Sequence, residues 1–361
     1  MRFGLLRLHH RQPSVGIEEL SEDERSQYRQ LFQTAGGRVD LYLLFWERAL
    51  QVLKDDGWIV FITPEKFTYV ETARPLRRMM SRYQLDELFY APEDTFQGLT
   101  TYPVIARLTK RDSQRATTIQ LRDGTSHSAR VPTLGESWQP VIHRSPSLSG
   151  AKTLADITLR VSCGVATGAD EMFLFDRTQL PAGYIPLAKP AIAGRDLRPG
   201  QPLQAPHRLL VMPYDDEGAL LPLSSLGELA EYLRQDTVRQ RLEARTCARR
   251  KPWHAFHETP PLRDMLRPKL VCKDITKEPY FWIDADGGNV PLHSTYYVVP
   301  GVPQLLEPLS HFLNSHEVRG WLFSNCQRAA NGFVRMQSTV MKRLPVPDKL
   351  VEVLVERSLA A

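Results

Sequence analysis

Cationic and aromatic side chains gather in one stretch of this sequence, RQRLEARTCARRKPWHAF, at residues 239–256. Six arginines and lysines stand there against a single carboxylate, and Trp253 closely follows them. Cations that neutralise phosphates release condensed counterions, and neighbouring rings can contact bases or sugars. The stretch therefore predicts a nucleic-acid groove, with a solvated helix face as an alternative of equal weight. The candidate contacts are Arg245, Arg249, Arg250, Lys251 and Trp253.

A second cationic segment, RPKLVCKDI, spans residues 267–275. Its apolar residues alternate with Lys269 and Lys273 as in a strand, where successive side chains point to opposite faces. Both lysines are therefore expected on the outer face of that strand, where they are candidate DNA contacts.

A third segment, GRDLRPG, spans residues 194–200. Arg195 and Arg198 are candidate phosphate contacts there. The alternative is a plain surface turn in which Asp196 is their internal partner.

An aromatic residue, Phe96, lies in PEDTFQGLTTYP between two expected strands. A ring on a loop at the open edge of an α/β sheet can stack on a flat ligand, which is worth ~1–3 kcal/mol per base. On this loop alone, a core aromatic is the preferred interpretation, and the surrounding motifs shift the balance toward a binding role.

Other classes of site are disfavoured. The hydrolase, metalloprotease and P-loop patterns GxSxG, HExxH and GxxxxGK[ST] are absent, and the glycine-bearing turn at residues 162–176 lacks GxGxxG spacing. The four cysteines, Cys163, Cys247, Cys272 and Cys326, have no metal-ligand spacing and are expected to be reduced thiols in or near a core. No metal site is predicted.

These residues need a framework of alternating helices and strands. Ser21 with Glu24 three positions on forms a capping box that opens the first helix. The apolar run WIVFIT reads as a fully buried parallel strand, and TTYPVIARLTK as an antiparallel edge strand. The order indicates the last part of a doubly wound α/β sheet, with helices at 21–32, 39–54 and 72–83, strands at 58–63, 85–91 and 100–110, and later helices near 226–250 and 304–325.

The bulk composition is that of an ordinary soluble protein. The chain has 361 residues, enough for two domains, and its net charge of +5 fits a phosphate-binding surface without requiring one. No apolar run reaches the ~18 residues of a membrane span, and no signal peptide opens the chain. A cytoplasmic protein without membrane contact is expected.

Five motifs in a fixed order then carry a family resemblance. They are GGRVDLYLLFWERAL, WIVFITPEKF, the Phe96 loop, GRDLRPG and LNSHEVRGWLF…VMKRLPVP, which together cover residues 17–348. In sequence and order they resemble the gamma-class adenine-N6 DNA methyltransferases of restriction–modification systems.

The resemblance implies methyl transfer from S-adenosylmethionine to an adenine flipped out of double-stranded DNA. It implies the C-terminal part of a Rossmann-like methyltransferase sheet (residues 1–112), a β element and linker (113–150), and an α+β DNA target-recognition domain (151–361). In the family, an Asn-Pro-Pro-Tyr motif holds the adenine amine and a later Phe packs on the base. Phe96 matches that Phe, and Pro13 matches one Pro of the motif.

The sequence departs from the family at two decisive positions. Arg11 replaces the acceptor Asn and Ser14 the stacking Tyr, and no Gly-rich cofactor loop precedes them. The chain is therefore expected to be the C-terminal part of such an enzyme, inactive alone, with an incomplete or missing cofactor site. It would come from a truncated gene or mis-called start, or would pair with an N-terminal half on a separate chain. The alternative is a DNA-binding specificity module or partner subunit that does no chemistry.

Overall fold

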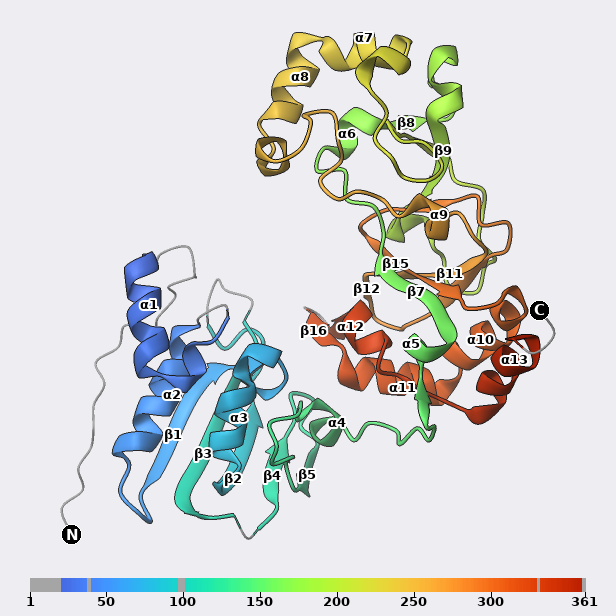
Figure 1. Cartoon of the computed structure of the whole chain (residues 1–361). Helices are drawn as coiled ribbons and strands as arrows, with labels where there is room; N and C mark the ends of the chain where they lie inside the picture. The colour runs from blue at the N-terminus through green and yellow to red at the C-terminus, as the bar shows by residue number, and fades with distance from the viewer. Residues whose placement is uncertain (1–20, 38–39, 97–100, 114, 330–331, 359–361) are drawn as a thin grey trace. The chain divides into compact units, whose positions relative to one another are not determined.

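A computed structural model describes residues 21–37, 40–96, 101–113, 115–329 and 332–358. The chain divides into two compact units, Met1–Ser145 and Pro146–Ala361. Each unit is described by itself, with the elements labelled as in Figure 1.

The first unit is built on a five-stranded sheet in the order β1-β3-β2-β4-β5 (Figure 1). Strand β3 runs antiparallel to both of its neighbours, β2 and β4 pair in parallel, and β4 and β5 pair antiparallel. Part of the segment expected as a separate β element and linker thus extends this sheet. The strands are β1 (Trp58–Pro64), β2 (Tyr83–Tyr90), β3 (Pro103–Asp112), β4 (Thr117–Gln120) and β5 (Ser126–Ala129).

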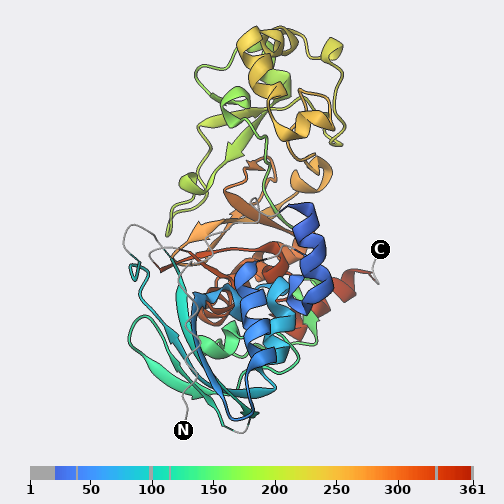
Figure 2. The same ribbon diagram turned by 90° about the vertical axis from the view of Figure 1, so that its left-hand side faces the viewer.

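Helices of the first unit cover one face of this sheet. Leu43 and Trp46 of α2 and Leu76 of α3 share a core with Ile59 of β1 and Leu108 of β3. Figure 2 shows α1, α2 and α3, in shades of blue, from the side of α1 and α2. The helices are α1 (Glu22–Leu31), α2 (Leu41–Val52), α3 (Arg74–Met80) and the short α4 (Gln139–Ile142).

The predicted start of the first helix is confirmed. The Ser21 side chain accepts from the Glu24 N–H, and the Glu24 carboxylate accepts from the Ser21 N–H at 2.8 Å. These hydrogen bonds satisfy backbone donors that the first turn of a helix leaves without partners.

The expected environment of WIVFIT was wrong. Strand β1 pairs antiparallel with β3, it ends the sheet in the described part of the chain, and Trp58 is 65% exposed. TTYPVIARLTK was correctly expected to be antiparallel, but its strand, β3, lies between β1 and β2 and is not an edge. An apolar run reports that a strand is apolar, not which neighbours pair with it.

The second unit is a mixed arrangement of small sheets and helices. Its four-stranded sheets have the orders β14-β9-β10-β8 and β13-β11-β15-β7, and a three-stranded sheet, β12-β17-β16, and a strand pair, β18-β6, complete it. The strands are β6 (Lys152–Thr153), β7 (Thr158–Cys163), β8 (Leu174–Asp176), β9 (Ala188–Ile192), β10 (Arg208–Val211), β11 (Lys269–Lys273), β12 (Ile275–Thr276), β13 (Phe281–Asp284), β14 (Val290–Pro291), β15 (Thr295–Pro300), β16 (Gln327–Ala329), β17 (Phe333–Arg335) and β18 (Pro345–Val346).

Two large cores, together with a smaller cluster that contains Trp282, hold the second unit together. One surrounds Phe173 and Phe256, and the other surrounds Leu309 and Leu322. The α-helices are α5 (Leu154–Ile157), α6 (Asp170–Phe173), α7 (Glu228–Arg234), α8 (Asp236–Glu243), α9 (Leu262–Met265), α10 (Leu306–Leu313), α11 (His316–Asn325), α12 (Ser338–Met341) and α13 (Asp348–Ser358).

The cysteines behave as predicted. All four are free thiols; three are buried and Cys163 is half-buried. Burial raises the pKa of Cys326 to about 12, so this thiol stays protonated at neutral pH. The described residues contain no group of side chains suited to a metal ion, and none of their helices is long and apolar enough to cross a bilayer.

Candidate functional site

The Phe96 loop leaves the sheet at the end of β2 and returns at the start of β3. Phe96 itself is half-buried, and residues 97–100 lie outside the described part of the chain. The base of the loop is closed by the backbone, where the Ala91 N–H donates to the Pro103 carbonyl at 3.1 Å. A partly accessible ring on a loop with a fixed base is suited to stacking.

A buried ion pair holds the base of this loop. Arg122 pairs with Glu65 at 2.8 Å, and Glu65 is only 1% exposed. The Arg122 guanidinium donates to the Ala91 carbonyl at 3.0 Å and lies 5.5 Å from the ring centroids of Tyr90 and Tyr102. Glu65 follows β1, Ala91 follows β2 and Arg122 follows β4. The cluster therefore joins the ends of these three strands at the base of the loop.

This cluster has a structural role, because its buried tyrosine is not ionised. Burial, followed by the charge of Glu65, raises the pKa of Tyr90 above its usual range, so its phenol stays neutral. Burial likewise raises the pKa of Tyr102. Pro13, the other candidate in this unit, lies outside the described residues.

In the second unit, the basic stretch at residues 239–256 is only partly free. It comprises the end of α8, a 3₁₀ turn at Thr246–Arg249 and the loop that follows. Arg249 and Arg250 are exposed, and neither guanidinium has a hydrogen-bond or ion-pair partner in the described part of the chain. These two arginines therefore remain candidates for phosphate contact.

Arg245 was wrongly expected in the exposed set, because it is only 7% exposed. Its guanidinium donates to the carbonyls of Leu242 (3.0 Å), Thr167 (2.5 Å), Trp253 (2.6 Å) and Ala255 (2.9 Å). The side chain therefore joins the basic stretch to the turn at Thr167, and burial lowers its pKa. The Arg245 side chain stabilises the packing of these segments, and it is not free to contact a phosphate.

The remaining candidates of this stretch have internal partners. The Lys251 ammonium donates to the His257 carbonyl at 3.1 Å, and Arg239 lies over the Trp253 ring at 5.5 Å. Two neighbours outside the candidate set also carry ion pairs: Arg239 with Glu243 and Arg241 with Glu171, both at 2.8 Å.

Lys269 was also wrongly placed by its sequence pattern. It is 0% exposed, and its ammonium donates to Asp284 at 2.5 Å and to the Gly287 carbonyl at 3.0 Å. Strand β11 lies between β13 and β15 and is covered on both faces, so alternation does not send its charges outward. Lys273, at the end of the same strand, is half-buried.

Arg195 and Arg198 are exposed, as a phosphate-contact role requires. Asp196 does not pair with them. Its carboxylate instead accepts from the Ala193 N–H at 2.7 Å and lies 3.5 Å from Arg208. The internal-partner alternative therefore applies to Arg208, and both candidate arginines remain available.

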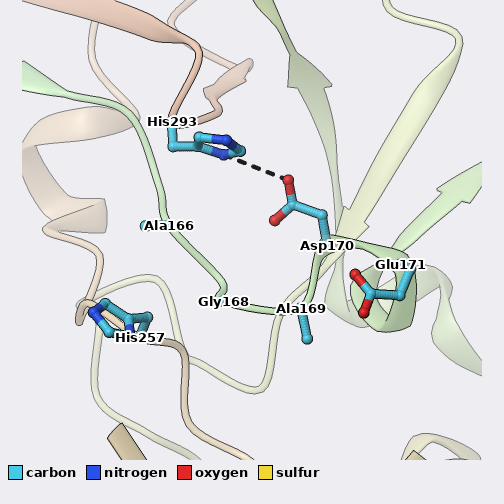
Figure 3. Close-up of a pocket in the computed structure, with 7 residues that line it drawn as sticks. All are labelled: Ala166, Gly168, Ala169, Asp170, Glu171, His257 and His293. Atoms are coloured by element: carbon cyan, nitrogen blue, oxygen red, sulfur yellow. Dashed lines mark ion pairs between the residues drawn. The ribbon is translucent and has the colours of Figure 1, made fainter. Parts of the chain in front are cut away.

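A pocket of about 470 Å³ beside Arg245 was missed by the sequence interpretation. Figure 3 shows His293 directed at Asp170, 3.4 Å away, with His257 on the other side. Gly168, at φ +75°, lets the turn approach closely: a Cβ there would meet His257 at 3.1 Å. The turn was visible in the sequence, but no local signal connects it with His293.

Comparisons with known proteins give this arrangement a context. The family model of the Eco57I restriction-modification methylase matches residues 13–96. The chain is 26% identical over 363 residues to the Type II methyltransferase M.XhoI of Xanthomonas vasicola, covering 89% of this chain and 64% of that relative. It is 26% identical over 374 residues to M.PaeR7I of Pseudomonas aeruginosa, covering 93% and 63%.

These likenesses support kinship with the restriction–modification methyltransferases. The fold agrees: a solved structure of the Type IIL restriction-modification enzyme MmeI superposes with a TM-score of 0.63 at 12% identity, covering 95% of this chain and 48% of MmeI. The chain spans less than two thirds of the length of M.XhoI and M.PaeR7I. The resemblance drawn from the sequence is confirmed at this level.

Proposed function

We propose that this chain is the DNA-binding part of a site-specific adenine-N6 DNA methyltransferase. We propose also that its five-stranded sheet is part of a Rossmann-like methyltransferase sheet. The methyl donor would be S-adenosylmethionine, and the acceptor an adenine flipped from double-stranded DNA. The likeness to Type II methyltransferases over 89% of the chain carries this proposal. Phe96 would form one wall of the base pocket, where stacking of ~1–3 kcal/mol offsets part of the unstacking cost.

The DNA contacts would be the exposed cations of the second unit. Arg249 and Arg250 are adjacent and exposed, and the half-buried Trp253 follows them three positions later in the chain. Arg195, Arg198, Lys251 and Lys273 are retained as secondary contacts, because they are exposed or half-buried. Phosphate contacts of this kind position a protein on the duplex without reading its sequence.

Replacing Arg249 and Arg250 together with Gln should lower the salt slope of duplex binding by roughly one to two units. Each lost phosphate contact releases about one counterion fewer. Fluorescence anisotropy with labelled double-stranded DNA at several salt concentrations measures the slope.

Lys342→Gln with Arg343→Gln is the matched control, since it removes two adjacent exposed cations from the same unit. This control should leave the slope unchanged. An equal slope for the wild-type chain and the Arg249/Arg250 variant would mean that the stretch at residues 239–256 is only a solvated surface that does not contact DNA.

The described residues of the first unit do not fit the proposed cofactor. A nucleotide-type cofactor needs a glycine turn between a strand and a helix. Gly36 and Gly37 precede α2 without a strand before them, Gly57 precedes a strand, and Gly124 joins β4 to β5. Gly135 lies between β5 and the four-residue α4, but it is packed against Arg74. At the end of β1, Glu65 is already paired with Arg122. No methyl-transfer step is therefore assigned to these residues.

The chain alone should not bind S-adenosylmethionine with micromolar affinity, and it should not methylate DNA. Isothermal titration with the cofactor and a tritium-transfer assay on duplex DNA test both expectations. A clear micromolar isotherm would refute the incomplete site. We propose that the cofactor pocket is formed by protein outside the described residues.

The second candidate function is a DNA-binding specificity module without catalysis. Arg11 and Ser14, in place of the family's Asn and Tyr, favour it. This module would be identified if the chain binds duplex DNA and no methylation occurs, even when a methyltransferase polypeptide is added.

A further inference from the structure

Arg122 lies in the turn between β4 and β5, at the edge of the sheet where β2 also ends. Phe89 of β2 lies opposite Gln120 of β4 in a parallel pair, so the two strands reach the same edge. Hydrogen bonds fix the turn, because the Asp123 carboxylate accepts from the Thr125 N–H at 2.9 Å and from its hydroxyl at 2.6 Å. A well-held turn therefore places Arg122 beside the end of β2.

The Arg122 guanidinium contacts both sides of the Phe96 loop. Where the loop leaves the sheet, its Nε donates to the Ala91 carbonyl at 3.0 Å, and its carbon lies 5.5 Å from the Tyr90 ring centroid. Where the loop returns, the same group lies 5.5 Å from the Tyr102 ring centroid. A guanidinium within about 6 Å of an aromatic ring is attracted to that ring. One side chain thus connects the two ends of the loop.

Glu65 holds the guanidinium in this place. Its carboxylate pairs with Arg122 at 2.8 Å and is 1% exposed. The Glu65 N–H also donates to the Tyr102 carbonyl at 2.8 Å, on the returning side of the loop. Burying a carboxylate away from a cation is costly, so Arg122 cannot turn away from Glu65 without a large loss of stability.

The first half of the loop connects this base with Phe96. The Thr95 N–H donates to the Pro92 carbonyl at 3.2 Å, and the Thr95 hydroxyl donates to the same carbonyl at 2.6 Å. The Thr101 N–H donates to the Glu93 carbonyl at 3.2 Å and joins the two sides again. Phe96 directly follows this turn, so the place of its ring depends on where the base of the loop is held.

We infer that Arg122 is a positioning residue for base stacking: it fixes both ends of the loop and so sets the orientation of the Phe96 ring. The inference rests on the proposed function for the role of Phe96, and it goes further by naming the group that orients the ring. Stacking depends on the offset and tilt of the two planes, and a shift of about 1 Å in a binding group is enough to weaken it.

The competing interpretation is that Arg122 only stabilises the fold. A residue with that role changes the amount of folded chain, so its loss weakens binding to every duplex by the same factor. A residue that positions Phe96 changes the preference for a base that can leave the duplex over one that is paired. The ratio of two affinities therefore distinguishes the interpretations.

The experiment compares two duplexes of one sequence. One is fully paired, and in the other the fluorescent adenine analogue 2-aminopurine faces an abasic position, where a base flips at the least cost. Both carry the same backbone charge, so phosphate contacts largely cancel in the ratio. The full chain should prefer the second duplex by about tenfold, or ~1.4 kcal/mol, which is in the range for stacking of one base.

Arg122→Lys should remove most of this preference. The lysine keeps a positive charge beside Glu65, which preserves the fold, but it has no planar fork to bond Ala91 and Glu65 together. The emission of the bound analogue should become that seen with Phe96→Ala. Combining Arg122→Lys with Phe96→Ala should lower the preference no further than Phe96→Ala alone, because both changes remove the same contact.

Arg78→Lys is the matched control. The Arg78 Nε likewise donates to a backbone carbonyl of the first unit, that of Leu134 at 2.7 Å, which lies outside the Phe96 loop. This variant should keep the wild-type preference. A full preference in Arg122→Lys, or additive losses with Phe96→Ala, would overturn the inference.

The Phe96→Ala variant separates this inference from the proposed function. If Phe96→Ala loses the preference and Arg122→Lys keeps it, the base-stacking role of Phe96 stands and the role of Arg122 is rejected. If the wild-type chain has no preference, or Phe96→Ala keeps it, the stacking role in the proposed function is rejected and the inference with it.

Discussion

Lys269→Met should lower the free energy of unfolding of the second unit by about 3–5 kcal/mol, because removing one partner of a buried ion pair leaves the other charge uncompensated. Asp284 is buried, and its carboxylate accepts from the Lys269 ammonium and, at 2.7 Å, from the Asn289 amide. Burial lowers the pKa of Lys269, and the carboxylate opposes that shift. Urea unfolding followed by hydrogen exchange at β11 gives the loss.

A double variant separates the ion pair from the space it fills. Lys269→Met with Asp284→Asn removes both charges, so most of the lost stability should return. Duplex binding by the folded fraction should keep the wild-type salt slope in both variants. A reduced slope would mean that Lys269 reaches DNA after all.

Arg245→Met should cost about 3–5 kcal/mol in the free energy of unfolding. The guanidinium satisfies buried carbonyls of Thr167, Trp253 and Ala255, and each acceptor left without a donor costs about 1–3 kcal/mol. Thermal unfolding followed by tryptophan fluorescence, which includes Trp253, measures the loss.

Arg249→Met provides the contrast. Its side chain is exposed and has no partner among the described residues, so its effect on stability should stay within ~0.5 kcal/mol. The order of the two effects should be reversed in DNA binding: Arg249→Met should lower the salt slope, and Arg245→Met should leave it unchanged. Equal stability losses in both would contradict the assigned role of Arg245.

Local signals in the sequence predicted local structure well. The capping box at Ser21 depends on residues three apart, and it formed as expected. The helical spacing that predicted residues 39–54 yielded α2 at Leu41–Val52. Both features depend on neighbours along the chain, which a single sequence displays directly.

The failures involve partners that lie far away in sequence. The alternation around Lys269 is real, but β11 is central in its sheet and covered on both faces. Arg245 stands in a run of cations, yet one of its acceptors, Thr167, is 78 positions away. His293 reaches Asp170 from another part of the second unit. Charge and periodicity do not specify such contacts.

The contacts of Arg245 also bear on protein engineering. Its side chain fastens the turn at Thr167 to the loop at Trp253 and Ala255, so these segments behave as a single mechanical piece. Anyone who transplants the exposed arginines onto another scaffold should carry residues 162–176 and 239–257 together. A graft of the cationic stretch alone would lose the turn whose Thr167 carbonyl accepts a hydrogen bond from Arg245.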